Sequence, residues 1–209
     1  WPFVETEKGQ GRGLLRRLSE RACLVVTDDF PCFIVPAQAE ALARKALVPV
    51  FAVDSNSVVP LSLLGPAVSA AAHLRPRIHK AFAEAWPHRA AARPRVPDVA
   101  TKRVRAPFDT WKAKDVAAFV DGLPLDPSVP PVEGMPGGTP AARARLREFL
   151  RKRLRGYAEA RSAPCAPAEG HASGLSPYLH FGHVSIEEVV ETALATTGKW
   201  SPDELRLHN

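Results

Sequence analysis

Short apolar runs alternate with an amphipathic stretch over residues 22–53. The segment ACLVV (22–26) is a continuous apolar run with β-branched residues, which is typical of a strand buried on both faces of a sheet. The segment PVFAV (49–53) has the same character. Between them, the alanine-rich segment 36–48 predicts a helix with Pro36 in its first turn. Strand, helix and strand within about 30 residues indicate a βαβ unit with parallel strands and a right-handed crossover.

Polar residues follow both predicted strands, at the edge of a parallel sheet where ligands bind in α/β proteins. These residues are Thr27, Asp28, Asp29, Asp54, Ser55 and Asn56. The same residue types also form ordinary turns and helix caps, and their local chemistry favours this second interpretation.

The middle of the chain loses this regularity. Residues 67–86 predict a helix that is interrupted at Pro76. Prolines, of which the sequence has 21, then cluster between about residues 87 and 140, in segments without clear periodicity. We therefore expect residues 67–138 to form a connector between two domains, with some helical content.

A helix of different character is predicted from residue 139, with Thr139 as its cap and Pro140 in its first turn. Apolar residues recur on one stripe at helical spacing, namely Leu146, Phe149, Leu150, Leu154 and Tyr157. The opposite face is basic and carries Arg143, Arg145, Arg147, Arg151, Lys152, Arg153 and Arg155. Such a face is most often a solvated surface, and the alternative is a surface that binds a polyanion.

Two further helices are predicted near the end of the sequence. Ser185 and Glu188 match a capping box at the start of one helix, and Gly198 is suited to its end. Ser201-Pro202 predicts the start of another helix. The second half of the sequence is therefore expected to be entirely helical.

Composition narrows the class of protein. Apolar residues make up 45% and charged residues 24% of the 209 residues, which is ordinary for a globular protein. No apolar run of about 18 residues is present, so we expect no segment that spans a membrane and no membrane partner. We also expect a monomer, and the sparse cysteines suit the reducing cytoplasm. Three widely spaced cysteines predict free thiols and no zinc site. The net charge of +6 permits a polyanionic partner.

Because the sequence begins at Trp1 rather than Met, we expect a fragment or a processed piece.

The segment HASGLSPYLHFGHVS (171–185) concentrates glycine, serine and histidine. Hydroxyl groups beside a glycine allow side chains and backbone amides to converge on an anion, and a helix starting near Pro177 adds a positive dipole end. A plain capped turn explains the same local pattern and is the commoner case. His180 and His183 lack a third ligand, so no metal is expected. Tyr178 and Phe181 are predicted to be core residues.

As a whole, SGLSPYLHFGHVS closely resembles the flavin-binding segment of the photolyase–cryptochrome family. The segments VVTDDFPCF (25–33), AVDSNSVVPL (52–61) and LRGYAEARSAP (154–164) are similar to class II cyclobutane pyrimidine dimer photolyases in particular. The segment 123–150 resembles the linker and first flavin-domain helix of that class. These segments keep the order of the family and cover most of the chain.

The resemblance implies an α/β fold class with three parts. Residues 1–66 would be the C-terminal part of a Rossmann-like α/β domain, 67–138 the connector, and 139–209 the start of an all-helical FAD-binding domain. The implied enzyme is a deoxyribodipyrimidine photo-lyase, which repairs pyrimidine dimers in UV-damaged DNA by light-driven electron transfer from reduced FAD. An antenna chromophore of unidentified type is also implied.

The resemblance assigns FAD contacts to five residues of this sequence. Tyr157 matches an aromatic residue near the flavin phosphates, and Ser173, Gly174, Leu175 and Ser176 match the segment that holds the diphosphate. Many members carry a threonine where this sequence has Ala172, which removes one hydroxyl contact. The catalytic residues and the electron-transfer tryptophans of the family fall outside this sequence, so Trp1, Trp86, Trp111 and Trp200 are not assigned to them. We expect the 209 residues alone to be inactive.

Two other functions remain open at this stage. A cryptochrome-like photoreceptor would bind FAD through the same segment and signal without repairing DNA. An unrelated basic module would bind DNA without flavin and with a strong dependence on salt. Arg151, Lys152 and Arg155 are candidates for phosphate contacts in either DNA-binding case.

Overall fold

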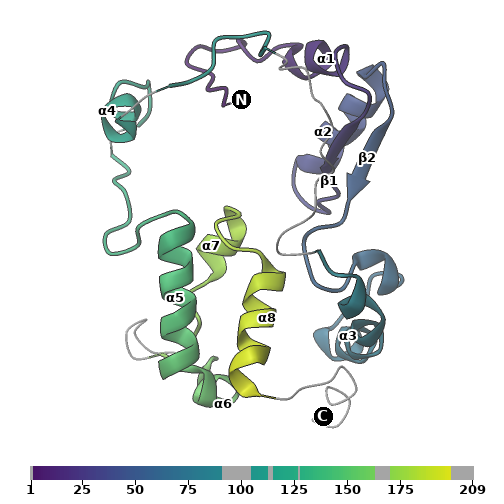
Figure 1. Ribbon diagram of the computed structural model, residues 1–209, viewed down its shortest axis with the longest axis vertical. Coiled ribbons are helices and arrows are strands. Elements are labelled where there is room, and N and C mark those ends of the chain that lie inside the picture. The colour runs from purple at the N-terminus through teal and green to yellow at the C-terminus, as the bar shows by residue number, and fades with distance from the viewer. Residues whose placement is uncertain (1, 91–104, 113–114, 127, 163–169, 199–209) are drawn as a thin grey trace. The chain divides into compact units, whose positions relative to one another are not determined.

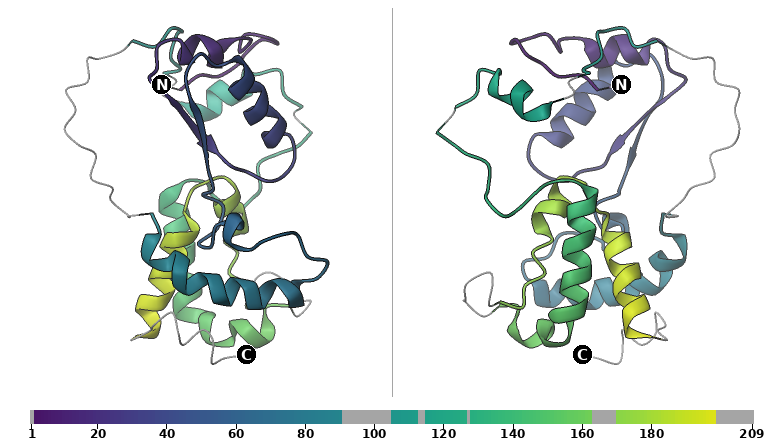
Figure 2. Two further views of the ribbon diagram at one scale, coloured as in Figure 1. Left: turned by 90° about the vertical axis from the view of Figure 1, so that its right-hand side faces the viewer. Right: turned by 60° about the vertical axis from the view of Figure 1, so that its left-hand side comes forward.

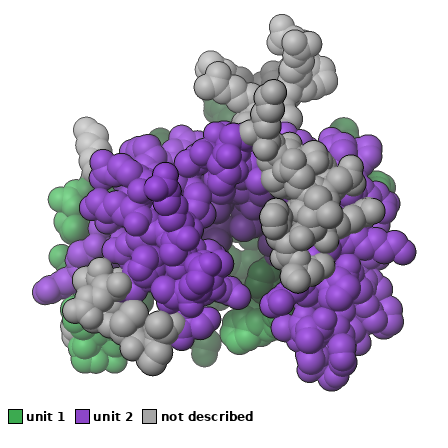
Figure 3. Space-filling model, turned by 90° about the horizontal axis from the view of Figure 1, so that it is seen from below, with its two compact units in different colours: residues 1–55, 95–131 green, residues 56–94, 132–209 purple. Residues whose placement is uncertain are grey.

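The computed structural model describes residues 2–90, 105–112, 115–126, 128–162 and 170–198. Helices dominate, and the strands form one small parallel sheet (Figure 1). Two compact units are distinguished in Figure 3, residues 1–55 with 95–131 (unit 1) and residues 56–94 with 132–209 (unit 2). In the part of the chain that is described, no helix has the length and apolar character needed to cross a membrane.

Unit 1 contains a parallel βαβ arrangement, as the sequence predicts. The short helix α1 (Leu14–Ser19) precedes strand β1 (Val25–Asp28). Strand β1 pairs in parallel with strand β2 (Val50–Val53), and helix α2 (Val35–Lys45) connects the two strands. The predicted first strand began at residue 22, three residues too early. The ladder begins where the Val25 amide donates to the Pro49 carbonyl, and Pro49 has no N–H to extend it.

The prediction that both strands are buried on two faces is wrong. Val26 is 60% exposed and Phe51 is 55% exposed, and helix α2 has no buried residue. Among the described residues of unit 1, only Leu14 and Ser19 are buried. A two-stranded sheet without a covering layer leaves its side chains in solvent, whatever the apolar character of its sequence.

The polar residues that follow the two strands do meet at one edge of the sheet. The Ser55 hydroxyl donates a hydrogen bond of 2.7 Å to the Asp28 carboxylate, and the Asp29 amide donates to the Val53 carbonyl at 2.8 Å. This edge is therefore formed by hydrogen bonds between the two strand ends.

Part of the predicted connector packs within unit 1. The Trp111 amide donates to the Pro2 carbonyl, and the rings of Phe3 and Phe108 meet edge to face at 5.2 Å. Helix α4 (Val116–Asp121) follows, and the Asp115 carboxylate caps it by accepting from the third residue beyond. The boundaries predicted for the three parts, after residues 66 and 138, stay a prediction.

Another part of the predicted connector belongs to unit 2. After the 3-10 turn η1 (Leu61–Leu63), helix α3 (Ala71–Ala85) runs without a break and is followed by the turn η2 (Trp86–His88). The predicted interruption at Pro76 is wrong. Pro76 lies in the second turn, where it costs one backbone hydrogen bond, and the helix continues because its later residues pack in a core. That core consists of Val59, Leu64, Ala81, Phe82 and Ala85.

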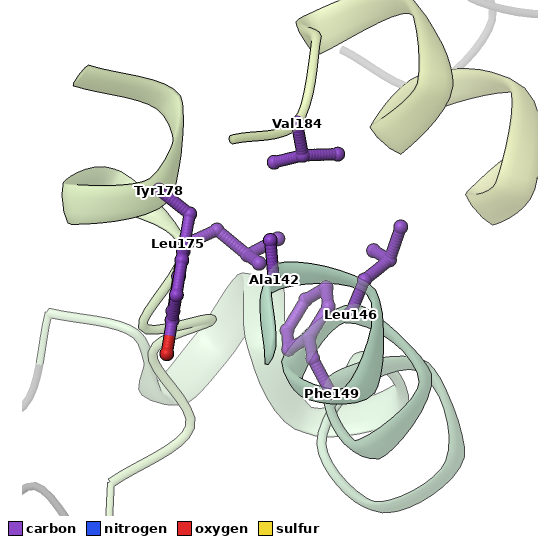
Figure 4. Packing of buried hydrophobic residues seen from close by; sticks show 6 residues of the cluster. All are labelled: Ala142, Leu146, Phe149, Leu175, Tyr178 and Val184. Carbon is purple, nitrogen blue, oxygen red and sulfur yellow. The ribbon is translucent and has the colours of Figure 1, made fainter. Parts of the chain in front are cut away.

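The second core of unit 2 forms around helix α5 (Thr139–Lys152). Its buried residues are Ala142, Leu146, Phe149, Leu175, Tyr178 and Val184, shown in Figure 4. The predicted stripe is confirmed, because its remaining members Leu150, Leu154 and Tyr157 pack against this cluster. The stripe crosses three elements, because α5 ends at Lys152 and is followed by the turn η3 (Leu154–Gly156) and helix α6 (Tyr157–Ala160). Thr139 is the first helical residue and not the cap, which is Gly138.

Helices α7 (Ser176–His180) and α8 (Ile186–Thr197) complete the described part of unit 2. The predicted cap of α8 is confirmed, because the Glu188 amide donates to the Ser185 hydroxyl at 3.1 Å. The Glu188 carboxylate accepts two hydrogen bonds from Arg143, at 2.6 and 3.1 Å, and so joins α8 to α5. The two helices lie side by side within unit 2 (Figure 2). Gly198 follows α8 with a φ of 96°. The helix predicted at Ser201 lies outside the described residues.

The α5 core yields a first prediction. Leu146 is 2% exposed, so Leu146→Ala removes buried apolar contacts and is expected to lower the free energy of unfolding by about 2–5 kcal/mol. Urea unfolding followed by circular dichroism measures this change. The matched control is Arg147→Ala on the exposed face of the same helix, which is expected to change stability by about 0.5 kcal/mol or less. Equal effects of the two substitutions would contradict the packing.

Candidate functional site

The five predicted cofactor-binding residues lie in two segments that pack on one core. Tyr157 is the first residue of α6, and residues 173–175 form a loop that leads into Ser176, the first residue of α7. Leu175 is 2% exposed and belongs to the α5 core cluster. Tyr157 packs against the same cluster, with its ring edge to face with Phe149 at 5.1 Å. The structure therefore gathers both segments around α5.

The loop is held by an arginine of α5. The Arg145 Nε donates a hydrogen bond of 3.1 Å to the Ser173 carbonyl. The guanidinium lies directly against Gly174, so that a Cβ there would sit 2.6 Å from Nε and 2.9 Å from Cζ. Gly174 also has a φ of +66°, in the left-handed region. The backbone conformation therefore favours glycine at this position, and a Cβ would in addition have to displace the guanidinium end of the Arg145 side chain.

The serine hydroxyls of the loop differ in their engagement. The Ser173 hydroxyl oxygen accepts a hydrogen bond of 3.3 Å from the Leu175 amide. A hydroxyl that accepts one bond still has its proton to donate to another acceptor. Ser176 is exposed at the start of α7. The loop thus presents two hydroxyl groups that are able to donate to an anion.

A histidine connects this loop to the turn before Tyr157. The His171 imidazole lies against Gly156, where a Cβ would be 2.7 Å from both Cε1 and Nδ1. Its Nδ1 atom is buried and has no hydrogen-bond partner among the described residues. His171 and Arg145 were both missed as site residues by sequence reasoning. Nothing in the sequence separates Arg145 from the other arginines of its helix, because its partner is a backbone carbonyl.

Much of the basic face of α5 is engaged within the protein. Arg143 binds Glu188, and Arg145 and Lys152 bind Glu148 at 3.4 and 3.6 Å. The pKa of the Glu148 carboxyl is held below its ordinary value of 4.5, mainly by the charge of Lys152. Arg151 and Arg155 are exposed, and they remain candidates for contact with a polyanion.

The residues around α7 give one confirmed and one wrong prediction. Tyr178 is a core residue, 5% exposed, and its hydroxyl donates to the Pro136 carbonyl at 3.0 Å. Phe181 is 71% exposed, so its assignment to the core is wrong. Helix α7 ends at His180, which places Phe181 and His183 beyond the helix, so the two histidines do not share one helical face.

Metal-ligating residues do not cluster in the described ranges. No group of three or more His, Cys, Asp or Glu residues is placed to hold a metal ion there. Cys23 and Cys32 are free and exposed, and Cys165 lies outside the described residues.

The donor groups around the loop suit a phosphate-bearing ligand. A guanidinium, two hydroxyl groups and a closely packed glycine are brought to one loop, and these are groups that bind phosphate oxygens. No protein-family model matches the sequence, and no curated protein matches it either. The assignment of the loop to FAD therefore depends on the resemblance and on this chemistry.

The loop geometry yields a second prediction. Gly174 and Gly182 share a φ of +66°, but only Gly174 is crowded, since nothing lies within 4 Å of a Cβ at Gly182. Both alanine substitutions carry the strain of a left-handed backbone, and Gly174→Ala must also displace Arg145. We expect Gly174→Ala to lower the free energy of unfolding by about 1 kcal/mol more than Gly182→Ala in urea titrations, because the displaced Arg145 loses its hydrogen bond to the Ser173 carbonyl. In an Arg145→Ala background the difference should vanish; if it persists, the arginine is not its cause.

The charges on α5 yield a third prediction. Because its pKa is lowered in the folded state, the Glu148 carboxylate contributes stability above its unfolded pKa, and this contribution is lost as the pH falls through the folded pKa. Lys152→Gln should raise the Glu148 pKa toward 4.5, as measured by an NMR titration of the side-chain carboxyl carbon. Arg147→Gln removes a neighbouring exposed charge and should leave the pKa unchanged. A pKa that does not respond to Lys152→Gln would contradict this ion pair.

Proposed function

We propose that this chain is part of a light-driven DNA repair flavoprotein, a photolyase that splits cyclobutane pyrimidine dimers. The resemblance of SGLSPYLHFGHVS and the ordered similar segments suggest this function. The observation that supports it is the gathering of Tyr157 and the loop 173–176 on one core, with an arginine and two serine hydroxyls at the loop. An ordinary capped turn requires only a residue that caps the helix. It does not require a guanidinium packed against its glycine, as is found here.

Within this proposal the chain's own residues bind and orient the FAD diphosphate. Ser173 and Ser176 would donate hydrogen bonds to phosphate oxygens, and the Gly174 backbone would permit close approach. Tyr157 would pack beside the phosphates from the start of α6. When bound, FAD would supply the light-driven electron transfer to the dimer. In this proposal, the residues of this chain hold FAD at its diphosphate.

The proposal extends to the rest of the chain. Unit 1, with its parallel βαβ arrangement, would belong to a Rossmann-like domain, and the helices from α5 onward would begin the FAD-binding domain. Arg151 and Arg155, both exposed, would contact phosphates of UV-damaged DNA. A cytoplasmic monomer and an antenna chromophore of unidentified type are further parts of the proposal.

The absorption spectrum of the natural protein that carries this sequence is the first test. Purified without added cofactor, the protein is expected to show flavin bands that bleach under light with a reductant. Repair of a thymine dimer in light, and none in darkness, would then separate a photolyase from a cryptochrome-like photoreceptor. A colourless folded protein that cannot be reconstituted with FAD would refute the proposal. Salt-dependent DNA binding by such a protein would favour a basic DNA-binding module.

A serine substitution tests the loop itself. Ser176→Ala removes one hydroxyl donor to the diphosphate and is expected to weaken FAD binding about ten-fold, as measured by fluorescence titration of the apoprotein. Ser162 is another exposed serine outside the loop, so Ser162→Ala is the matched control and should leave the affinity unchanged. Equal FAD affinity of both variants would remove Ser176 from the site.

A further inference from the structure

Among the charged side chains of α5, Arg145 alone hydrogen-bonds to the loop 173–176 in the described structure. Its Nε donates to the Ser173 carbonyl at 3.1 Å, and its Nη1 donates to Glu148 at 3.4 Å. The side chain is 29% exposed, whereas those of Arg143 and Lys152 are 53% and 57% exposed. The hydrogen bond to Ser173, the longer contact to Glu148 and partial burial together hold the guanidinium beside the loop.

The third nitrogen of this guanidinium faces the loop. Nη2 lies against Gly174, and no described residue accepts a hydrogen bond from it. It therefore retains two N–H donors and shares a full positive charge at the point where the loop backbone turns. A fixed guanidinium with free donors is suited to phosphate oxygens, which it binds with charge-assisted hydrogen bonds.

We infer that Arg145 is a positioning residue for the loop 173–176 and also a direct ligand of the diphosphate bound there. The inference rests on the proposed function for the identity of that anion. Through Nε, Arg145 holds the Ser173 carbonyl and thereby the left-handed Gly174, which sets the Ser173 hydroxyl beneath the Leu175 amide. Through Nη2, it adds a cation to a loop whose own groups are neutral.

Arg145 differs from the other arginines of the basic face in the effect that its substitution should have on the loop. A solvated basic face tolerates exchange of one arginine for another polar residue, because each charge contributes little. Arg145 and Gly174 instead form a matched pair, since a larger residue at position 174 would occupy the space of the guanidinium. Substitution of Arg145 should therefore affect the loop, and substitution of Arg147 should not.

The experiment compares Arg145→Ala, Arg145→Lys and the control Arg147→Ala in the natural protein that carries this sequence. Arg145→Ala and Arg147→Ala remove the same charge from the same helix, so non-specific electrostatic effects are matched. Hydrogen–deuterium exchange of peptides covering residues 173–176, without ligand, measures the positioning role. Titrations with FAD, riboflavin and inorganic pyrophosphate measure the role as a ligand.

The expected result is faster exchange of the loop in Arg145→Ala and unchanged exchange in Arg147→Ala. FAD and pyrophosphate affinity should fall about ten-fold or more in Arg145→Ala, while riboflavin, which has no phosphate, should bind as before. Arg145→Lys keeps the charge without the planar fork and should restore part of the FAD affinity. A loss of riboflavin and FAD binding to the same extent would indicate a general structural defect and would overturn the inference.

Two other outcomes also decide the matter. Unchanged exchange and unchanged pyrophosphate affinity in Arg145→Ala would overturn the inference even if the wild-type protein binds FAD, and the proposed function would stand. Pyrophosphate binding that depends on Arg145 in a protein that binds no FAD would support the inference for a diphosphate and refute the flavin. Arg145→Lys decides the same questions if Arg145→Ala does not fold.

Discussion

The packing of Leu175 into the core around α5 is the contact on which the rest of the candidate site depends. Leu175 is buried against residues of α5 and lies between Gly174 and Ser176, so its burial fixes the height of the loop above the helix. With Leu175 in place, the Ser173 carbonyl comes within reach of Arg145 and the Leu175 amide within reach of the Ser173 hydroxyl. One apolar side chain thus brings the polar groups of the loop into range.

Apolar and polar groups contribute differently to this arrangement: the apolar contact stabilises the loop, and the polar contacts select its conformation. The burial of Leu175 supplies the free energy that holds the loop on the helix, because burying a leucine side chain contributes about 1.5–3 kcal/mol. Hydrogen bonds contribute less net stability, but they depend strongly on direction. Arg145 therefore selects one conformation among those that the buried leucine allows, and Gly174 is the residue that can adopt it beside the guanidinium.

Several features that local sequence determines were predicted well, although the cap expected at Thr139 and the break expected at Pro76 were not found. The parallel βαβ arrangement, the apolar stripe ending at Tyr157 and the cap at Ser185 each follow from periodicity or from a side chain bonding its own backbone neighbours. Features that depend on distant neighbours were not. Phe181 was predicted to be a core residue, but α7 ends one residue before it and leaves it exposed. Val26 was predicted to be buried, but no layer covers its sheet. Arg145 looked like one arginine of a basic face, because only the fold places the Ser173 carbonyl beside it.

The length of α7 explains why a side-chain cation matters at this loop. The positive end of a helix arises from aligned peptide dipoles, and α7 has only five residues to align. The electrostatic attraction expected from the sequence, a helix end at Pro177, is therefore weak. A guanidinium carries a full charge, of which Glu148 offsets a part here, and its bonds to Ser173 and Glu148 already hold it beside the loop. An anion that binds does not have to order it, so less entropy is lost on binding than for a free surface arginine. The loop thus gains from α5 the positive charge that its own short helix cannot supply.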